Sequence, residues 1–282
     1  MGKHSERTRL QLTRTLTRTF LALCLALCST LSVAAETRSD KLPWKTWEFA
    51  LGGYLTTHDS TLRIDDPSTG TGTEIGLEDD LGFDQSIQTV RFDARWRFKP
   101  RHRAEFSIYQ LDRQASKTLE RTIEVGDKVF PAGTLVTSEA NMTVYKASYS
   151  YSVVQNSRFD VGLAAGLHIL DLKESIAAEG AGISEFSKFL APLPVLGLHV
   201  DWAITPSVFL KSNIDVFAVS VDSTRGRLTD GLVALEYNAF KHFGVGLGYN
   251  YVSMLVKGDK ENFRGEIGIS YGAVMLYGKL YY

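Results

Sequence analysis

The sequence predicts an all-β protein, a transmembrane antiparallel β-barrel with ten strands. Three observations support this fold class. Segments in which apolar and polar residues alternate recur along the chain, no long apolar segment follows residue 35, and short and long polar connections alternate. A backbone in lipid must satisfy its own hydrogen bonds, which only helices and closed barrels do. Because no spanning helix is evident, the strands would have to close into a barrel.

The amino terminus has the features of a secretory signal peptide. Its first part is basic, and the apolar run that follows ends on the small residues Val33, Ala34 and Ala35. That run is shorter than the roughly 20 residues of a spanning helix. We therefore predict a leader over residues 1–35 and an outer-membrane barrel domain over residues 36–282.

Composition excludes several functional classes. The leader holds five of the 31 basic residues and one of the 32 acidic residues, so the remaining chain has a net charge near −5. This mild acidity gives no sign of nucleic-acid binding. Both cysteines, Cys24 and Cys28, lie in the leader, which leaves no disulfide framework. A lipoprotein anchor is an alternative, although Leu23 and Leu27 stand where a small residue should precede the cysteine.

The segment VRFDARWRF, residues 90–98, shows the alternation most clearly. One face would carry Val90, Phe92, Ala94, Trp96 and Phe98, and the other Arg91, Asp93, Arg95 and Arg97. Similar patterns begin at Trp47, Tyr145, Phe159, Leu198, Val233 and Val245. A soluble β-sandwich alternates in the same way and is the alternative fold.

Polar connections set the predicted strand count. Short breaks lie near Pro100, Asn156, Pro206 and His242. Longer polar segments separate them, at roughly Thr57–Asp84, Glu120–Thr134, Glu174–Glu185, Ser220–Arg227 and Lys257–Asn262. Tight inner turns and longer outer loops are typical of outer-membrane barrels, and four inner turns with both termini inside give ten strands. Eight or twelve strands are alternatives, because alternation slips after Tyr109 and the segment Phe263–Tyr282 could hold another hairpin.

Aromatic residues gather near the predicted inner ends of the strands. They are Trp44, Trp47, Trp96, Phe98, Tyr149, Tyr151, Trp202, Phe240, Phe243, Tyr281 and Tyr282. This placement predicts an aromatic girdle at the membrane–water interface on the side of the tight inner turns.

The carboxyl end, AVMLYGKLYY, resembles the last strand of outer-membrane proteins, which ends in an aromatic residue and is recognised by the barrel-assembly machinery. Tyr282 stands where that family favours Phe. Together with the leader and the cysteine-free remainder, it resembles small Gram-negative outer-membrane barrels of the broad OmpA/OmpW-like type. GLEDDLGFD followed by VRFDARWRFKPRHRAEFSIYQLDR is similar to uncharacterised proteobacterial surface barrels. The resemblance implies an outer-membrane location and contact with lipid and lipopolysaccharide. It transfers no active site and no cofactor.

The candidate functional residues are polar side chains that the alternation places on the lumen side. They are Arg91, Asp93, Arg95, Arg97, Glu105, Lys146, His168, His199, Asp201, Lys211, Asp215, Glu236 and Lys279. Because both signs of charge are present, these side chains can pair and fill a narrow interior. The alternative is a polar pathway for small solutes.

Three of these residues, His168, His199 and Asp201, could in principle belong to a hydrolase. Counted from the inner turns, the two histidines differ in height by about 10 Å, beyond hydrogen-bond reach. We therefore predict no catalytic residue and no enzyme, and expect a structural barrel or a narrow passive channel with extracellular loops. A barrel hydrolase acting on lipid A or peptides and a surface adhesin or receptor are the alternatives.

The acidic run EIGLEDDLGFD, Glu74–Asp84, lies between the first outer loop and the next strand. We expect its carboxylates at the outer rim, in water or sharing divalent cations with lipopolysaccharide phosphates. The preceding DDPSTGTGTE, Asp65–Glu74, lacks the ligand order of a calcium-binding hand and predicts a solvated loop. GDKVFPAGTLV, Gly126–Val136, predicts a turn in the second outer loop.

Overall fold

The computed structural model describes residues 42–66, 70–178, 182–221, 224–260 and 263–282. The predicted leader over residues 1–35 and its cleavage site lie outside these residues and stay predictions. Within the described ranges, no helix is long and apolar enough to cross a membrane.

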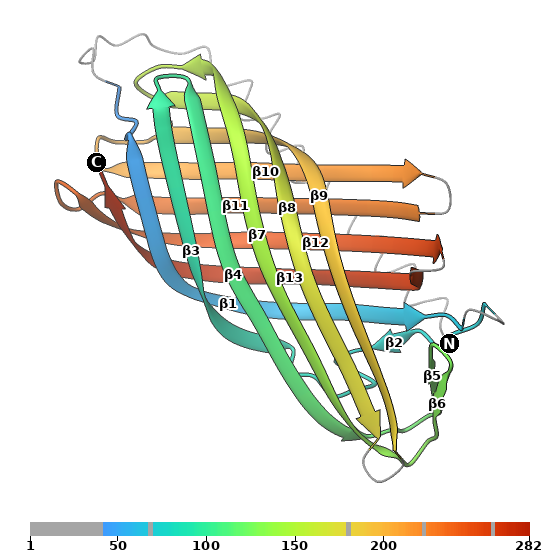
Figure 1. Ribbon diagram of the computed structural model, residues 1–282. Coiled ribbons are helices and arrows are strands. Elements are labelled where there is room, and N and C mark those ends of the chain that lie inside the picture. The colour runs from blue at the N-terminus through green and yellow to red at the C-terminus, as the bar shows by residue number, and fades with distance from the viewer. Residues whose placement is uncertain (1–41, 67–69, 179–181, 222–223, 261–262) are drawn as a thin grey trace, which may run out of the picture. The chain divides into compact units, whose positions relative to one another are not determined.

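Thirteen strands make up the described fold. They are β1 (Trp47–Ile64), β2 (Ile75–Gly76), β3 (Ser86–Lys99), β4 (His102–Thr118), β5 (Ile123–Val125), β6 (Lys128–Phe130), β7 (Leu135–Gln155), β8 (Phe159–Ala178), β9 (Ile183–Ala203), β10 (Val208–Val221), β11 (Thr224–Tyr237), β12 (Phe243–Lys260) and β13 (Phe263–Tyr281). Ten of them, β1, β3, β4 and β7 to β13, form one sheet that closes because β13 pairs with β1 (Figure 1). β2 pairs with β1, and β5 and β6 form a separate hairpin. The ten-stranded antiparallel barrel is confirmed, and the last segment is a single strand.

The four predicted inner turns are confirmed. They connect β3 to β4, β7 to β8, β9 to β10 and β11 to β12. Side chains fix two of these turns. The Asn156 carboxamide oxygen accepts from the backbone amides of Arg158 and Phe159, both at 2.8 Å. The Thr205 hydroxyl accepts from the backbone amide of Val208 at 3.0 Å. Such side chain to backbone bonds explain why these polar residues stop the strands here.

Three of the five predicted long outer loops are wrong. The segments predicted as loops at Glu174–Glu185, Ser220–Arg227 and Lys257–Asn262 are mostly strand, because β8 continues to Ala178 and β9 begins at Ile183, with similar extensions of β10 to β13. Polar residues continue a ladder when a neighbouring strand supplies backbone partners, and their side chains can remain in water. β1 likewise runs to Ile64, seven residues beyond the predicted loop start at Thr57.

The outer wall carries an apolar band next to the inner turns. Long side chains such as Leu163, Leu247 and Leu276 are 59%, 56% and 68% exposed on this wall. Trp47 and Trp96 stack at 4.9 Å between centroids near its inner edge. A continuous exposed apolar surface of this kind is the lipid-facing surface of a membrane barrel.

Tyr281 is an exception to the predicted aromatic girdle. Its side chain faces the barrel interior and is buried, and its hydroxyl donates to the carbonyl of Phe240. Strand parity decides this, because Tyr281 alternates with the outward-facing Leu280 and the exposed Tyr282.

The distribution of side chains inverts along the strands. On β4, Phe106 faces outward, whereas farther along the strand the apolar Tyr109 and Leu111 are buried together with Arg113, and Gln110 and Asp112 are exposed. Counted from the inner turns, the unbroken series of apolar outward residues on β4, β7 and β8 ends at Ile108, Tyr145 and Ile169, which pair with one another across the sheet. The apparent slip after Tyr109 is therefore this inversion. We call the parts of the barrel on the two sides of this line the membrane half and the outer half.

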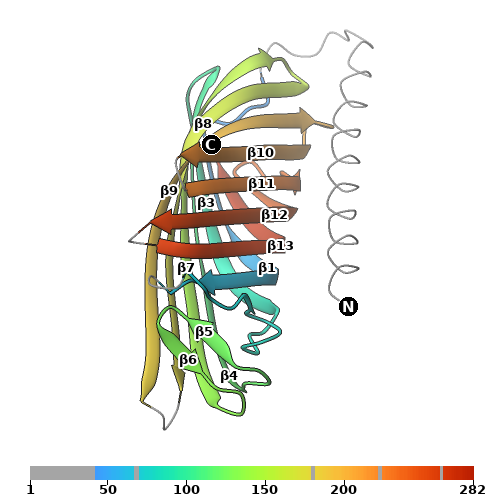
Figure 2. The same ribbon diagram turned by 90° about the vertical axis from the view of Figure 1, so that its right-hand side faces the viewer.

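The outer half contains an apolar core. Residues 75–83, here called the plug segment, contribute Ile75, Leu77, Leu81 and Phe83 to it. The β5–β6 hairpin adds the fully buried Ile123 and Phe130, and it lies at the end of the barrel where β4 ends and β9 begins (Figure 2). The first and second outer connections thus pack against the strands.

Candidate functional site

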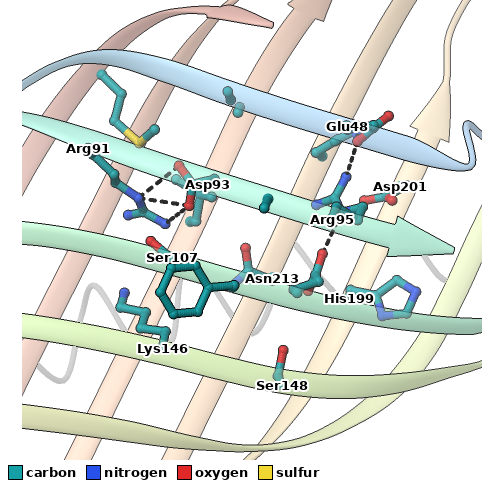
Figure 3. A pocket seen from close by; sticks show the side chains of 18 of the residues that line it. Glu48, Arg91, Asp93, Arg95, Ser107, Lys146, Ser148, His199, Asp201 and Asn213 are labelled. Carbon is teal, nitrogen blue, oxygen red and sulfur yellow. Dashed lines mark hydrogen bonds and ion pairs between the residues drawn. The ribbon is translucent and has the colours of Figure 1, made fainter. Parts of the chain in front are cut away.

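The interior of the membrane half contains a polar cavity. Its volume is about 110 Å³, and it is lined by every predicted lumen residue except Arg97, among them Arg91, Lys146 and His199 (Figure 3). These side chains come from β3, β4, β7 to β11 and β13 because strand alternation places every second residue inside. Arg97 lies beside the cavity and pairs with Asp160 at 2.5 Å.

Ion pairs join the strands around this cavity. Arg95 on β3 contacts Glu48 on β1 at 2.8 Å and Glu105 on β4 at 2.5 Å. Lys211 on β10 contacts the same Glu48 at 2.5 Å and Glu236 at 3.3 Å. Figure 3 shows Arg95 next to Glu48, with a dashed line joining the two side chains. Since each carboxylate serves several cations, the charges form a network and not isolated pairs.

Further pairs link strands that are not neighbours in the sheet. Arg103 on β4 contacts Asp201 on β9 at 2.9 Å, and only 1% of the arginine is exposed. Lys146 on β7 contacts Asp230 on β11. Each pair therefore spans the lumen from wall to wall.

Several members of this network were not among the predicted residues. They are Glu48, Arg103, Asp160, Asp230 and Asn250. The sequence contained a usable pattern for Glu48, Asp160 and Asn250, since each stands between two apolar residues, as Glu48 does between Trp47 and Phe49. Arg103 and Asp230 lack this pattern, because His102 precedes Arg103 and Asp230 lies between Thr229 and Gly231.

The two buried histidines contact acids. His168 lies 3.4 Å from Asp215 and 3.7 Å from Asp230, and His199 lies 3.7 Å from Asp160. In the part of the chain that the structure describes, no hydrogen bond joins a serine hydroxyl to either imidazole. These contacts suit charge pairing, whereas nucleophilic catalysis requires a hydroxyl within hydrogen-bond reach of the base.

A layer of hydrogen-bonded side chains covers the outer side of the cavity. The Tyr54 hydroxyl donates to the side-chain Oδ1 of Asn250 at 2.6 Å, and the same oxygen accepts from Arg91 at 3.1 Å. The Tyr109 and Tyr271 hydroxyls lie 2.5 Å apart. Beyond this layer begins the apolar core of the outer half.

The acidic run is partly buried, which corrects its predicted position. Glu78 pairs with Arg113 on β4 at 2.6 Å, its side chain is 7% exposed, and it accepts the Ser60 amide at 2.9 Å. Asp80 accepts from Arg121 at 2.7 Å, and this hydrogen bond holds the pKa of the Asp80 carboxyl below its ordinary value. These acids attach the plug segment to the wall because buried acids need partners.

The described residues form no cluster of metal-ligating side chains. Among residues 42–66, 70–178, 182–221, 224–260 and 263–282, no group of three or more His, Cys, Asp or Glu side chains is arranged to hold a metal ion. Binding of divalent cations by the acidic run remains a prediction, since Asp79 and Asp84 are exposed.

Comparison with known proteins defines the fold. No protein-family model matches the sequence, and neither does any curated protein. The outer membrane protease OmpT from Escherichia coli is similar in structure, with a TM-score of 0.52, 10% identity, and coverage of 88% of this chain and 100% of that chain. The translocator domain of the autotransporter NalP from Neisseria meningitidis gives a TM-score of 0.42 at 10% identity, covering 96% of this chain and 98% of that one. OprG from Pseudomonas aeruginosa gives 0.36 at 10% identity, covering 86% and 99%.

At this level of identity the likeness to OmpT concerns the fold alone. The closed sheet and its exposed apolar band independently require a lipid environment. The chain therefore has the fold of outer-membrane β-barrel proteins and an outer surface suited to lipid.

Proposed function

We propose that the protein is a closed structural barrel of the outer membrane that holds a rigid projection above it, and that it does not conduct solutes at rest. The observation that supports this role is the apolar core of the outer half, which extends from β1 through β4, β7, β8 and β9 to β12 and β13. It lies between the polar cavity and the outer end of the barrel. An apolar core of this kind opposes the passage of ions and polar solutes.

The charge network opposes conduction as well. A solute moving along the lumen would have to separate pairs such as Arg103–Asp201 and Lys146–Asp230, which join opposite walls. Separating a buried pair costs several kcal/mol. The 110 Å³ of free space suffices for several water molecules and little more.

The projection would be held to the barrel by specific contacts. The Glu78–Arg113 pair fixes the plug segment to β4, and the Gly126 amide donates to the Ile64 carbonyl at 3.2 Å, which fixes the β5–β6 hairpin to β1. Lipid and lipopolysaccharide around the apolar band, and the barrel-assembly machinery during insertion, are the proposed partners.

The test is single-channel recording in planar bilayers, with folding checked by migration on gels before and after boiling. We expect no stepwise current from the wild-type protein. A variant with Tyr54, Leu111 and Met254 all replaced by Ser removes apolar volume from the core and should give current, which shows that the assay detects an opened lumen. Stepwise current from the wild type, with an ion selectivity that changes in Arg95→Gln, would instead establish a narrow passive channel.

A further inference from the structure

Strand β9 separates from β10 along much of its length. β9 pairs with β8 from Ile183 to Trp202 but with β10 only from Leu196 to Ala203. β10 in turn pairs only with β11 beyond Val216. Figure 1 shows β9 following β8 while β10 runs in another direction. We call the boundary between residues 183–195 of β9 and residues 217–221 of β10 the seam.

The seam begins at the outer edge of the lipid-facing band. The last β9–β10 pair is Leu196 with Val216, and Val216 pairs on its other side with Thr229, where the outward face of β11 becomes polar. On β8, the unbroken series of apolar outward residues ends at Ile169, which pairs with Pro192. On the β10 side the strands therefore part at the polar boundary, and on the β9 side they part four residues before it, because Leu196 pairs with Ala165.

The sequence of β9 fits an open edge at this point. The Val208 carbonyl accepts from the Ile204 amide, so Val208 and alternate residues after it direct their backbone groups toward β9. Their partners on β9 are alternate residues up to Leu196, and the next two residues in that series are Pro194 and Pro192. Proline has no N–H, so the open edge carries no unpaired donor at either position.

Apolar side chains lie on both faces of the seam. Leu190 and Leu196 on the outward face are 61% and 68% exposed. Leu193 and Val195 on the inward face belong to the apolar core, and Phe217 of β10 packs against it. The seam thus connects the lipid-facing wall to the core of the outer half. At Pro194 and Pro192, where the seam begins, β9 has no backbone N–H.

Two lysines lie directly opposite each other beside the seam. Lys173 of β8 pairs in register with Lys188 of β9, and both side chains are exposed on the outward face. Neither forms an ion pair within the described parts of the chain. Like charges in directly opposed positions are destabilising, and an anion between them would remove that cost.

The lysines stand at the height of lipid headgroups. Lys173 is four residues above Ile169, about 13 Å along the strand and about 10 Å in height at a tilt near 40°. The headgroup region extends several Å beyond the hydrocarbon on each side of the bilayer. An amphiphile with its phosphate at the lysines would have its acyl chain at the level of Pro192 and Pro194.

We propose that the seam binds an anionic lipid of the outer leaflet, with the phosphate held by Lys173 and Lys188 and an acyl chain inserted between β9 and β10 against the apolar core. The chemistry of the site selects this occupant: two unpaired cations above a donor-free apolar edge that faces lipid. This inference does not depend on whether the barrel conducts.

The experiment uses the full chain reconstituted in phosphatidylcholine vesicles that contain a phosphatidylglycerol with a photoreactive group in its acyl chain. Labelled residues are mapped by mass spectrometry after illumination. We expect labelling of the inward-facing Leu193, Val195 or Phe217, because only an inserted chain reaches them. Labels confined to outward residues such as Leu190 and Val216 would overturn the proposal.

Charge variants test the headgroup site in the same preparation. K173Q combined with K188Q should lower inward labelling about 25-fold, since each lysine near an anionic lipid contributes about a factor of five, while outward labelling stays unchanged as an internal control. K257Q is the matched control, because Lys257 is an exposed cation of β12 that pairs with Glu266 at 2.6 Å. Equal inward labelling by a photoreactive phosphatidylcholine, unaffected by K173Q and K188Q, would overturn the assignment to an anionic lipid.

Discussion

The membrane half and the outer half are built from the same strands but have opposite side-chain distributions. In the membrane half, Leu163 faces lipid while His168 lies in the charged interior; in the outer half of the same strand, Asp171 faces outward while Leu172 is buried. The parity of the strand does not change between them. Only the composition of each face changes, because the medium outside the wall changes from lipid to water.

This difference shows where each half obtains its cohesion. In water, burying apolar side chains inside the barrel is favourable, so the outer half resembles the interior of a soluble protein. In lipid, no comparable gain separates the inside from the outside, and the interior can hold charges provided that they are paired. Substitutions should therefore have opposite effects at equivalent positions of the two halves.

The largest expected effect is that of Leu111→Asp. Leu111 is 1% exposed in the core of the outer half, so the new carboxyl would be buried, and the nearby Arg113 already pairs with Glu78. We expect a loss of about 4 kcal/mol or more. Gln110→Asp, one residue earlier and exposed, should change stability by less than about 0.5 kcal/mol. Urea unfolding in lipid vesicles measures both, and equal losses would contradict the inverted arrangement.

Leu163→Arg tests the lipid-facing surface of the membrane half. Its side chain faces lipid in the membrane half, where an arginine costs roughly 2–4 kcal/mol near the bilayer midplane. Asp171→Arg is the matched control, since it also faces outward on β8 but lies above the apolar band. We expect the control to fold as the wild type does in the same assay. A comparable loss in both variants would place the membrane boundary higher than Ile169.

Much of the fold could be predicted from the sequence because strand alternation is a local property. VRFDARWRF is enough to assign the faces of β3, and residues such as Pro100 and Asn156 stop strands through local backbone and side-chain chemistry. The lengths of β8 to β13 could not be predicted in this way. A Ser- and Glu-rich segment such as Glu174–Glu185 forms strand only when its neighbours pair with it.

The ion pairs of the site were less predictable than the set of residues that face inward. Alternation assigned Arg95 and Lys211 to the inside, but their shared acid Glu48 is distant in sequence, and such pairing depends on the register of the closed sheet. The burial of Glu78 was missed for the same reason, since its partner Arg113 lies 35 residues away. An acidic run shows charge, and only the packed structure shows which acids are neutralised.

Glu174→Gln should change the stability of the outer half in a pH-dependent way. Glu174 lies on the inward face of β8 above the apolar band, near Arg113, His58 and Glu185, and burial raises the pKa of its carboxyl to about 7. Because the folded-state pKa lies above the ordinary 4.5, its contribution to stability is fully present below pH 4.5 and is lost as pH rises through 7.

At pH 8.5 the variant should therefore be more stable than the wild type by about 1–2 kcal/mol, and near pH 4.5 the two should be similar. Amide hydrogen exchange in β7, β8 and β9 measures this difference locally. The exchange of amides in the membrane half serves as the internal control. A gain of the same size at both pH values would show that charge at Glu174 is not its cause.

The smallest expected effect is that of Asp80→Asn in the plug segment. Asp80 pairs with Arg121, which is half exposed, so the pair should contribute less than about 1 kcal/mol and weaken in high salt. The pKa of the Asp80 carboxyl is lowered, so its contribution to stability is present above its ordinary value of 3.8 and is lost as pH falls through the lower folded-state pKa.

We expect slightly faster proteolysis of the plug segment in Asp80→Asn at pH 7, with exposed Asp79→Asn as the control. If Asp80→Asn instead released the plug as fully as loss of the buried Glu78–Arg113 pair, the attachment would rest on the surface pair, and burial would not be what distinguishes the outer half.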